Sequence, residues 1–399
     1  MKLRDFFRFP LAIGFLATAC GAQPSPGKLP GHVKSLDVYA DDGRLHVLLA
    51  TNTDGQENAG LYYTASEDNG TSWSSYTRIG TSCAPAYARG RGTDFQLAAK
   101  GGRIMAVWMQ HGTGFMGRGP LSSAISEDGG KTWRNTGNPA DDGSDGDHSF
   151  IDVTASKDGD FHAVWLDKRS GNAKGLYSSV YKVGKGKWQT NRCVDAVTCE
   201  CCWNVVKSSQ SGGLYTLYRD SSPRDMAWAS SMDNGASWQK GGPAGNFQWD
   251  IQACVHVGGG LAIEERLKAP CLHAVIWTAN QFNPGLYYLF LDTQEGKWQE
   301  PVPLADVDCT LPDIAVSKDG QVVATWIKRS AQGNQLYYSV RSKQSQAWDK
   351  PIHVPTGKLA PTHPKIACLD NTFHLFWSGP ADNVETWQHQ KIPPCPNRG

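Results

Sequence analysis

The sequence lacks an excess of either charge, long apolar runs and helical periodicity. Lys and Arg total 39 and Asp and Glu total 38, so the chain has no overall basic field of the kind that binds nucleic acid. No stretch reaches the ~18 consecutive apolar residues that span a bilayer. Segments with a 3.6-residue apolar period are missing too, which argues against a helical repeat protein. With 43 glycines and 15 tryptophans in 399 residues, the composition favours many short strands joined by turns.

The first 19 residues have the features of a secretory signal. A basic start precedes a short apolar run, and small residues lead to Cys20 in LATAC, which resembles a bacterial lipoprotein cleavage site. We therefore expect residues 1–19 to be removed, Cys20 to carry a lipid and residues 20–32 to form a linker. A plain signal peptide is the alternative. Either way the protein would be exported to the cell envelope, to the periplasm or the outer membrane.

One eight-residue phrase occurs three times, as SEDNGTSW at 66–73, SEDGGKTW at 126–133 and SMDNGASW at 231–238. Ser and Asp side chains accept hydrogen bonds from turn amides, and Gly supplies a positive φ where the chain reverses. Trp offers a large apolar surface for packing. We expect each phrase to close the outer hairpin of a sheet. Because one Asp in each of three units cannot converge on one substrate, a structural role is favoured over a catalytic one.

The phrases belong to a longer repeat of about 50–60 residues. Its tryptophans are Trp73, Trp133, Trp188, Trp238, Trp298 and Trp348. An apolar strand such as RLHVLLA or DFHAVWL precedes each of them, and a seventh copy, TFHLFWS, lies at 372–378. Four strands per unit predict an all-β propeller of four-stranded blades, with seven blades favoured and six as the alternative. The domain would cover 33–391, followed by a tail at 392–399.

Two local expectations accompany this fold. The last unit contains three clear strands, so we expect the segment around 32–34 to lend it a fourth. The stretch LAIEERLKAP at 261–270 is the place where a short helix is considered.

The three phrases resemble the Asp boxes of the sialidase and BNR-repeat families, S-x-D-x-G-x-x-W. The resemblance covers roughly 33–391 and implies the propeller fold and a glycan ligand. Sialidases also carry an early Arg motif, two further Arg that clamp a carboxylate, a Tyr–Glu pair and an Asp acid. Here FRFP at 7–10 matches the first motif but lies inside the signal, and the first blade offers no replacement. The catalytic residues therefore stay unassigned, and enzymatic activity, which would be glycoside hydrolysis, stays open.

A binding face is still predicted, because loops entering the innermost strands and loops between second and third strands share one face of a propeller. Arg captures carboxylate, sulfate or phosphate in bidentate fashion, and neighbouring acids can act as acids, bases or ion-pair partners. The candidate ligand-binding residues are Arg89, Arg91, Asp147, His148, Asp167, Arg169, Arg219, Asp220, Arg224, Asp225, Trp249, Asp250 and Arg329.

A cysteine-rich segment, TCECCWN, enters the innermost strand of the fourth unit. In an exported protein the favoured interpretation is disulfide bonding, with Cys193 able to reach this segment and Cys254 paired with Cys271. The alternative is a copper or zinc site made by Cys199, Cys201, Cys202 and His148.

The sequence thus predicts an exported monomeric propeller that binds, and in one version hydrolyses, an anionic glycan on its loop face. It would touch the membrane through a lipid anchor alone and bind no nucleic acid, and no cofactor is expected. The second alternative is a non-catalytic scaffold of the cell envelope or a protein that handles a soft metal.

Overall fold

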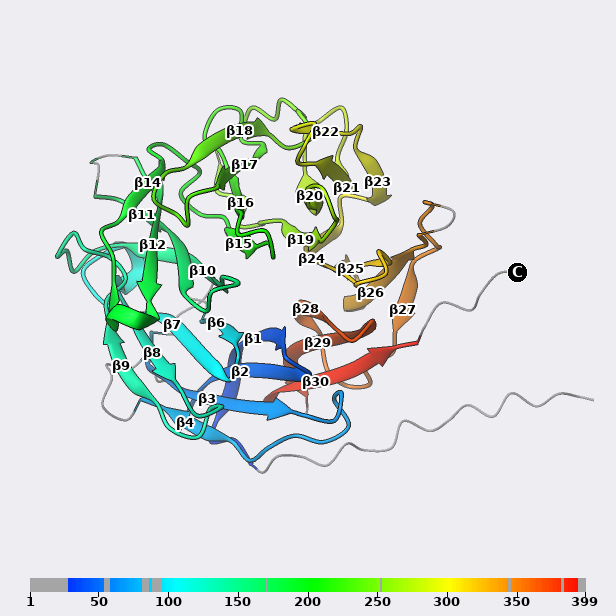
Figure 1. The fold of residues 1–399 in the computed structure, drawn as a ribbon. Coiled ribbons are helices and arrows are strands. Elements are labelled where there is room, and N and C mark those ends of the chain that lie inside the picture. Colours follow the sequence, from blue (N-terminus) through cyan, green and yellow to red (C-terminus); the bar gives the residue numbers. More distant parts are fainter. Residues whose placement is uncertain are drawn as a thin grey trace, which may run out of the picture.

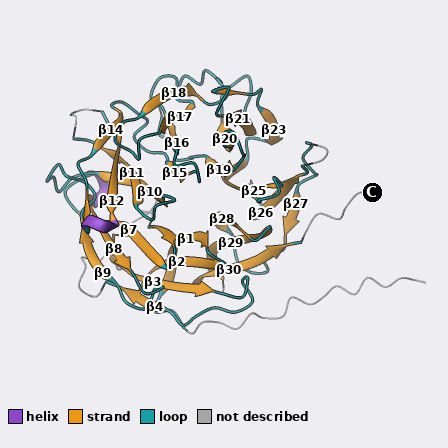
Figure 2. Cartoon of the chain, viewed as in Figure 1, coloured by secondary structure: helices purple, strands orange, loops and turns teal. Residues whose placement is uncertain are grey.

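The computed structural model describes residues 28–53, 58–80, 86–87, 95–169, 171, 173–251, 253–343, 346–381 and 384–393. Seven antiparallel sheets stand as blades around a central axis (Figure 1). Loops connect the strands, and the helical content of the described residues is two short 3-10 turns at Phe115–Gly117 and Val183–Lys185 (Figure 2). No helix in the described ranges is long and apolar enough to cross a membrane. The seven-bladed prediction is confirmed.

The strands follow chain order from the axis outward in each blade. Blade 1 contains β1 (His32–Asp41), β2 (Arg44–Asn52), β3 (Asn58–Ser66), β4 (Thr77–Ile79) and β5 (Ala86–Tyr87). Blade 2 contains β6 (Gln96–Lys100), β7 (Arg103–His111), β8 (Arg118–Ser126) and β9 (Arg134–Gly137). Blade 3 contains β10 (His148–Ala155), β11 (Phe161–Asp167), β12 (Gly175–Lys182), β13 (Lys187–Trp188) and β14 (Arg192–Asp195). Blade 4 contains β15 (Val205–Ser208), β16 (Leu214–Arg219), β17 (Met226–Ser231) and β18 (Gln239–Pro243).

The remaining blades repeat this order. Blade 5 contains β19 (Gly260–Glu264), β20 (Cys271–Thr278), β21 (Gly285–Asp292), β22 (Lys297–Trp298) and β23 (Val302–Ala305). Blade 6 contains β24 (Cys309–Val316), β25 (Val322–Ser330), β26 (Gly333–Arg341) and β27 (Ile352–Val354). Blade 7 contains β28 (Thr362–Leu369), β29 (Thr372–Ala381) and β30 (Val384–Ile392).

Two local expectations are wrong. Residues His32 and Val33 begin β1 and pair with Asn52 and Thr51 of β2, so they belong to blade 1 and lend no strand to blade 7. Ring closure instead relies on side chains between these blades. The segment considered for a helix starts within β19, because its residues 261–264 pair with residues 271–274 of β20.

The core lies between neighbouring blades, because each sheet buries both of its faces against the next sheet. The second strands are almost wholly buried, and Trp108, Trp165 and Trp326 on these strands are each at most 1% exposed. Such near-complete burial explains why these strands read as continuous apolar runs.

Each phrase tryptophan contacts the preceding blade. Trp133 packs edge-on against Tyr63, with ring centroids 5.6 Å apart, and the Trp238 indole N–H donates to Ser178 Oγ over 2.8 Å. Trp73 makes the equivalent contact across the closure, 5.4 Å from Trp387. The remaining contacts are Trp188 to Ser123, Trp298 to Trp228 and Trp348 to Tyr288. The repeated Trp therefore joins blades as well as closing a hairpin.

Candidate functional site

The described candidate residues lie at one end of the ring, in loops and at strand ends. We call the described residues of the segments 138–147, 168–174, 196–204, 220–225 and 244–259 the loop face. Hydrogen bonds join these loops to one another: Arg224 N–H donates to Trp249 O over 2.9 Å, and Thr198 N–H donates to Lys174 O over 2.8 Å. The three repeated phrases, at 66–73, 126–133 and 231–238, lie at the other end of the strands. Each forms the turn between the third and fourth strand of its blade.

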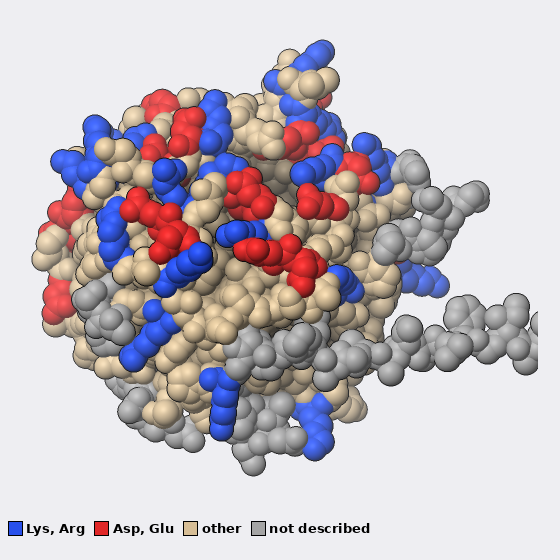
Figure 3. All heavy atoms as spheres, turned by 60° about the horizontal axis from the view of Figure 1, so that its bottom comes forward, with Lys and Arg blue, Asp and Glu red and all other residues tan. Residues whose placement is uncertain are grey.

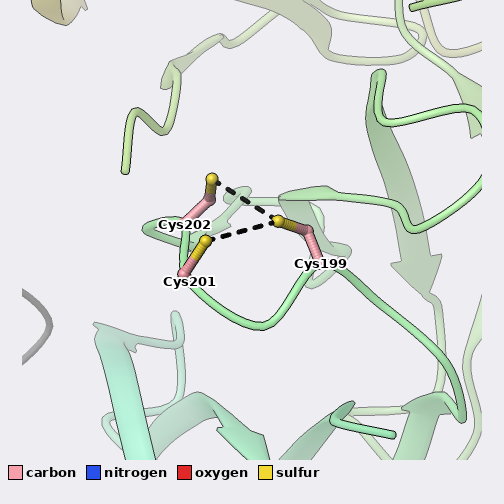
Figure 4. Close-up of side chains that lie close together, drawn as sticks. All are labelled: Cys199, Cys201 and Cys202. Atoms are coloured by element: carbon pink, nitrogen blue, oxygen red, sulfur yellow. Dashed lines mark hydrogen bonds between the residues drawn. The ribbon is translucent and has the colours of Figure 1, made fainter. Parts of the chain in front are cut away.

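Three cysteines of the loop face point their sulfur atoms toward one another (Figure 4). Cys199 Sγ lies 3.8 Å from Cys201 Sγ and 3.8 Å from Cys202 Sγ. All three side chains are buried, between 1% and 4% exposed. We call Cys199, Cys201 and Cys202 the cysteine cluster. It sits in the loop that leads from β14 into β15, packed on the core between blades 3 and 4.

A second group overlaps this cluster. The sulfur atoms of Cys201 and Cys254 and a ring nitrogen of His256 lie within 4.8 Å of one another. Cys254 and His256 come from the loop before β19, and Cys254 is exposed. We call Cys201, Cys254 and His256 the outer group. Sequence reasoning missed His256, which carries no motif, although its i, i+2 spacing from Cys254 was a usable signal.

The expected cysteine pairings do not form among the described residues. All eight described cysteines are free thiols in this structure. Cys254 lies beside Cys201 instead of bonding to Cys271, and the exposed Cys193 lies outside both groups. His148 does not join the cysteine cluster either, because it contacts two carboxylates of blade 3, those of Asp142 and Asp167.

Two arginines surround the cysteine cluster. Arg224 Nη1 lies 3.3 Å from Cys199 Sγ. Arg219 is 2% exposed and donates to the carbonyl oxygens of Arg224, Val257 and Trp277. Its guanidinium also lies 5.3 Å from the ring centre of Trp249. Arg219 therefore fixes the loops and is not presented to a soluble ligand.

The contacts within the cysteine cluster separate the acidities of its thiols. Hydrogen bonds from the thiols of Cys201 and Cys202, together with the charge of Arg219, lower the pKa of Cys199. The hydrogen bond to Cys199 raises the pKa of Cys201, and burial raises the pKa of Cys202. These contacts make Cys199 the most acidic thiol of the cysteine cluster.

A separate acidic group lies in blade 3, at the start of β10, at the end of β11 and in the loop before β10. His148 Nε2 lies 3.1 Å from Asp142 Oδ1 and 3.5 Å from Asp167 Oδ2. His148 and Asp167 are each 1% exposed. Burial acts to raise the pKa of Asp142, but the charges of His148 and Arg169 and a hydrogen bond from Ser144 outweigh it and lower that pKa. We call Asp142, His148 and Asp167 the acidic group.

Arg169 closes this group. Its Nη2 lies 2.7 Å from Asp167 Oδ2, and its Nη1 lies 2.7 Å from Asp141 Oδ1. The guanidinium is thus already paired with carboxylates. Asp147 is likewise paired, with the buried ammonium of Lys174 at 2.9 Å.

The other candidate residues divide between structural and solvent-exposed positions. Asp225 is buried and accepts the backbone N–H groups of Gln248 and Trp249, over 2.7 Å and 3.0 Å. Asp220 is half-buried, and burial raises its pKa. Asp250 and Arg329 are exposed. Arg89 and Arg91 lie outside the described residues. On the face seen in Figure 3, acidic and basic side chains are interspersed and no patch of one sign dominates.

Sequence reasoning missed a set of polar residues on the axis. A cavity of about 130 Å³ lies between the innermost strands. Its charged and amide side chains are Asp37, Gln96, Asp152, Asn204, Lys207, Asp313 and Lys365. Three carboxylates accept a backbone N–H from the next innermost strand: Asp37 from Leu97, Asp152 from Val206 and Asp313 from Ile366. The recurrence of SLDV, FIDV and LPDI at these positions was the available signal. These carboxylates hold blades together around the axis.

Comparisons with known proteins support the fold alone. No family model matches the chain, and no curated protein matches it. Among solved structures it is similar to the polysaccharide lyase Uly1, with a TM-score of 0.53, 11% identity, and coverage of 95% of this chain and 94% of that one. It is also similar to a Trypanosoma rangeli sialidase in complex with the inhibitor DANA, with a TM-score of 0.51 and 11% identity. That match covers 82% of this chain and 58% of the sialidase. Because the identity is 11% in both cases, these matches show a shared fold and nothing about activity.

Proposed function

We propose that the loop face of this protein binds a thiolate-preferring metal ion through Cys199, Cys201 and Cys202. The observation that carries the proposal is the pair of 3.8 Å distances from Cys199 Sγ to the other two sulfur atoms. Two thiolates bound to one tetrahedral Zn²⁺ at about 2.3 Å lie about 3.8 Å apart. The donor set suits Zn²⁺ and Cu⁺ alike, because both accept several thiolates.

Disulfide bonding explains this geometry less well. A disulfide needs a sulfur–sulfur distance of about 2.05 Å, well below the 3.8 Å found here. Three mutually facing thiols also cannot pair completely with one another. The guanidinium of Arg224 beside Cys199 favours a thiolate at this position, and a thiolate is the form that binds metal.

Simple core packing is the remaining alternative, since a buried free cysteine often behaves as a small apolar residue. The cluster differs from that case because its sulfur atoms meet one another and a charged guanidinium. Cys309, by contrast, is buried in blade 6, and its sulfur contacts a carboxylate oxygen of Asp306.

Metal analysis of protein purified without chelator tests the proposal. We expect the wild type to bind Zn²⁺ or Cu⁺ tightly. Supplying each metal in turn shows which of the two ions the protein prefers. Cys202→Ser should weaken binding by more than the roughly 10–100-fold typical of losing an outer partner of a metal ligand. Cys193→Ser is the matched control, because Cys193 is exposed and outside the cluster. Thiol alkylation of the wild type with and without metal covers the case in which Cys202→Ser fails to fold. Disulfides among the three cysteines in the native protein, or no bound metal, would overturn the proposal.

A second candidate is binding or cleavage of an anionic glycan. It is supported by the acidic group, in which carboxylate oxygens of Asp142 and Asp167 lie 3.1 Å and 3.5 Å from the buried imidazole of His148, a set of groups with the chemistry of acid–base catalysis. The structural neighbours include enzymes named as a sialidase and a polysaccharide lyase.

Glycan-array binding, a fluorogenic sialoside and a reducing-end assay on acidic polysaccharides test this candidate. If the acidic group acts in catalysis, Asp167→Asn should lower turnover about 100-fold or more while glycan affinity changes little. Asp250→Asn, at an exposed position of the same face, is the control. Absence of any binding or turnover by the wild type would eliminate the candidate.

We also propose that the protein is exported, lipid-anchored through Cys20 and monomeric, with no nucleic-acid partner. Cys20 lies outside the described residues. Mass spectrometry of the mature N-terminus tests the anchor, and an unmodified start after Cys20 would contradict it.

A further inference from the structure

We infer that the metal site holds two ions that share the sulfur atom of Cys201. This inference rests on the proposed function and extends it. Cys201 is the one residue common to the cysteine cluster and the outer group. A thiolate sulfur has enough lone pairs to bind two metal ions at once, so a shared cysteine can act as a bridge.

The two groups provide separate ligand sets for two ions. Cys199 and Cys202 make the first ligand set with Cys201. Cys254 and His256 make the second set with the same Cys201. In each set the ligand atoms lie within 4.8 Å of one another, a span that one metal ion can bridge. Three protein ligands with a further position for water or an incoming ligand are typical of an open zinc site.

The ligands come from two loops that are in direct contact. The cysteine cluster lies in the loop before β15, and Cys254 and His256 lie in the loop before β19. A Cβ atom placed on Gly258 would lie 2.7 Å from the carbonyl oxygen of Trp203, so the loops approach as closely as a glycine allows. Arg219 donates to Val257 O over 3.1 Å and keeps the second loop against the first. The outer ligands are therefore held by the fold.

The two positions differ in exposure. Cys199 and Cys202 are each 1% exposed, whereas Cys254 is exposed and His256 is half-buried. An ion at the cysteine cluster would be shielded from solvent, and an ion at the outer group would be accessible. We infer that the outer ion exchanges with solvent while the inner ion is retained.

Zinc titration of the reduced, metal-free full chain tests this inference. We expect about two Zn²⁺ per chain in the wild type and about one in Cys254→Ser and in His256→Asn. A chelator should remove one ion from the wild type quickly and the other slowly, and the fast phase should be missing in both variants. Cys193→Ser should behave as the wild type.

Co²⁺ loading adds a spectroscopic test of the bridge. Two Co²⁺ ions that share a thiolate couple magnetically, so the wild type should have a weaker paramagnetic signal per ion than Cys254→Ser. One Zn²⁺ in the wild type, lost only in the cysteine-cluster variants, would overturn the two-ion inference and leave the proposed function standing. No bound Zn²⁺ or Cu⁺ in the wild type would overturn both. Two ions with no magnetic coupling would overturn the bridge.

Discussion

At the scale of single residues, one aspartate organises each repeated turn. Asp128 Oδ1 accepts the backbone N–H groups of Lys131 and Thr132, over 3.0 Å and 2.9 Å, and Oδ2 accepts the Thr132 hydroxyl over 2.6 Å. Ser126 Oγ accepts the Gly130 N–H over 2.8 Å. The hydrogen bonds to Asp128, first that from the Thr132 hydroxyl, lower the pKa of Asp128 to about 2. Asp68 and Asp233 likewise accept the hydroxyl of the residue four positions later, Ser72 and Ser237 respectively.

Asp128→Ala should therefore destabilise the protein without changing metal binding. The variant loses the acceptor for four donors of one turn, much as a helix loses its N-cap, and we expect the melting temperature to fall by a few degrees. Differential scanning calorimetry measures the change. Glu127→Ala is the control, because its exposed ion pair with Arg134, at 3.4 Å, adds little stability. A normal melting temperature together with loss of Zn²⁺ would show that the turn serves the site instead of the blade.

At the scale of elements, the strands and outer turns could be predicted from the sequence because their signals are local. Alternating and continuous apolar runs mark the strands, and the Ser, Asp, Gly and Trp of each phrase mark a turn within eight residues. The repeat spacing then predicts the number of blades. The repeated Trp also joins each blade to the preceding one. This contact could not be predicted from one repeat unit, because it depends on how neighbouring sheets are placed against each other.

The site was only partly predictable, for a physical reason. Cys199, Cys201 and Cys202 are close in sequence, so their proximity needed no long-range information. Cys254 and His256 reach them from another blade, and that approach depends on the path of two loops and on Arg219 between them. Several predicted ligand arginines proved to be paired internally, because charged side chains that the fold buries must be satisfied within the protein.

At the scale of the whole molecule, closure of the ring depends on side chains between blades 1 and 7. Trp387 Nε1 donates to the Tyr76 hydroxyl over 3.0 Å. His374 Nε2 contacts Asn69 Oδ1 at 2.8 Å, and its Nδ1 lies 2.9 Å from His389 Nε2. Burial lowers the pKa of His374 to about 4 and that of His389 to about 3. The closure therefore contains two imidazoles that stay neutral at neutral pH.

Three further buried histidines extend this behaviour around the ring, and four carboxylates oppose it. Burial lowers the pKa values of His46 and His162 to about 4 and lowers that of His273. Burial also raises the pKa of Asp152 to about 6 and raises the pKa values of Asp220, Glu265 and Asp313, so these groups stabilise the fold as pH falls. The histidines outnumber them, and their lowered pKa values set the net direction.

The free energy of unfolding should consequently fall as pH falls from about 6.5 toward 4. Over that range the unfolded chain, with ordinary histidine pKa values near 6.5, binds protons that the folded chain excludes, and each such histidine costs about 1.4 kcal/mol per pH unit. Urea unfolding at pH 7, 6 and 5 measures the slope. His46→Gln removes one titrating group, whose Nδ1 lies 2.7 Å from the Tyr63 hydroxyl, so its slope should correspond to about one proton fewer than the wild type. The slope reports protonation regardless of any loss of stability in the variant. A free energy of unfolding that stays constant or rises as the pH is lowered from 7 to 5 would contradict the burial of neutral histidines between the blades.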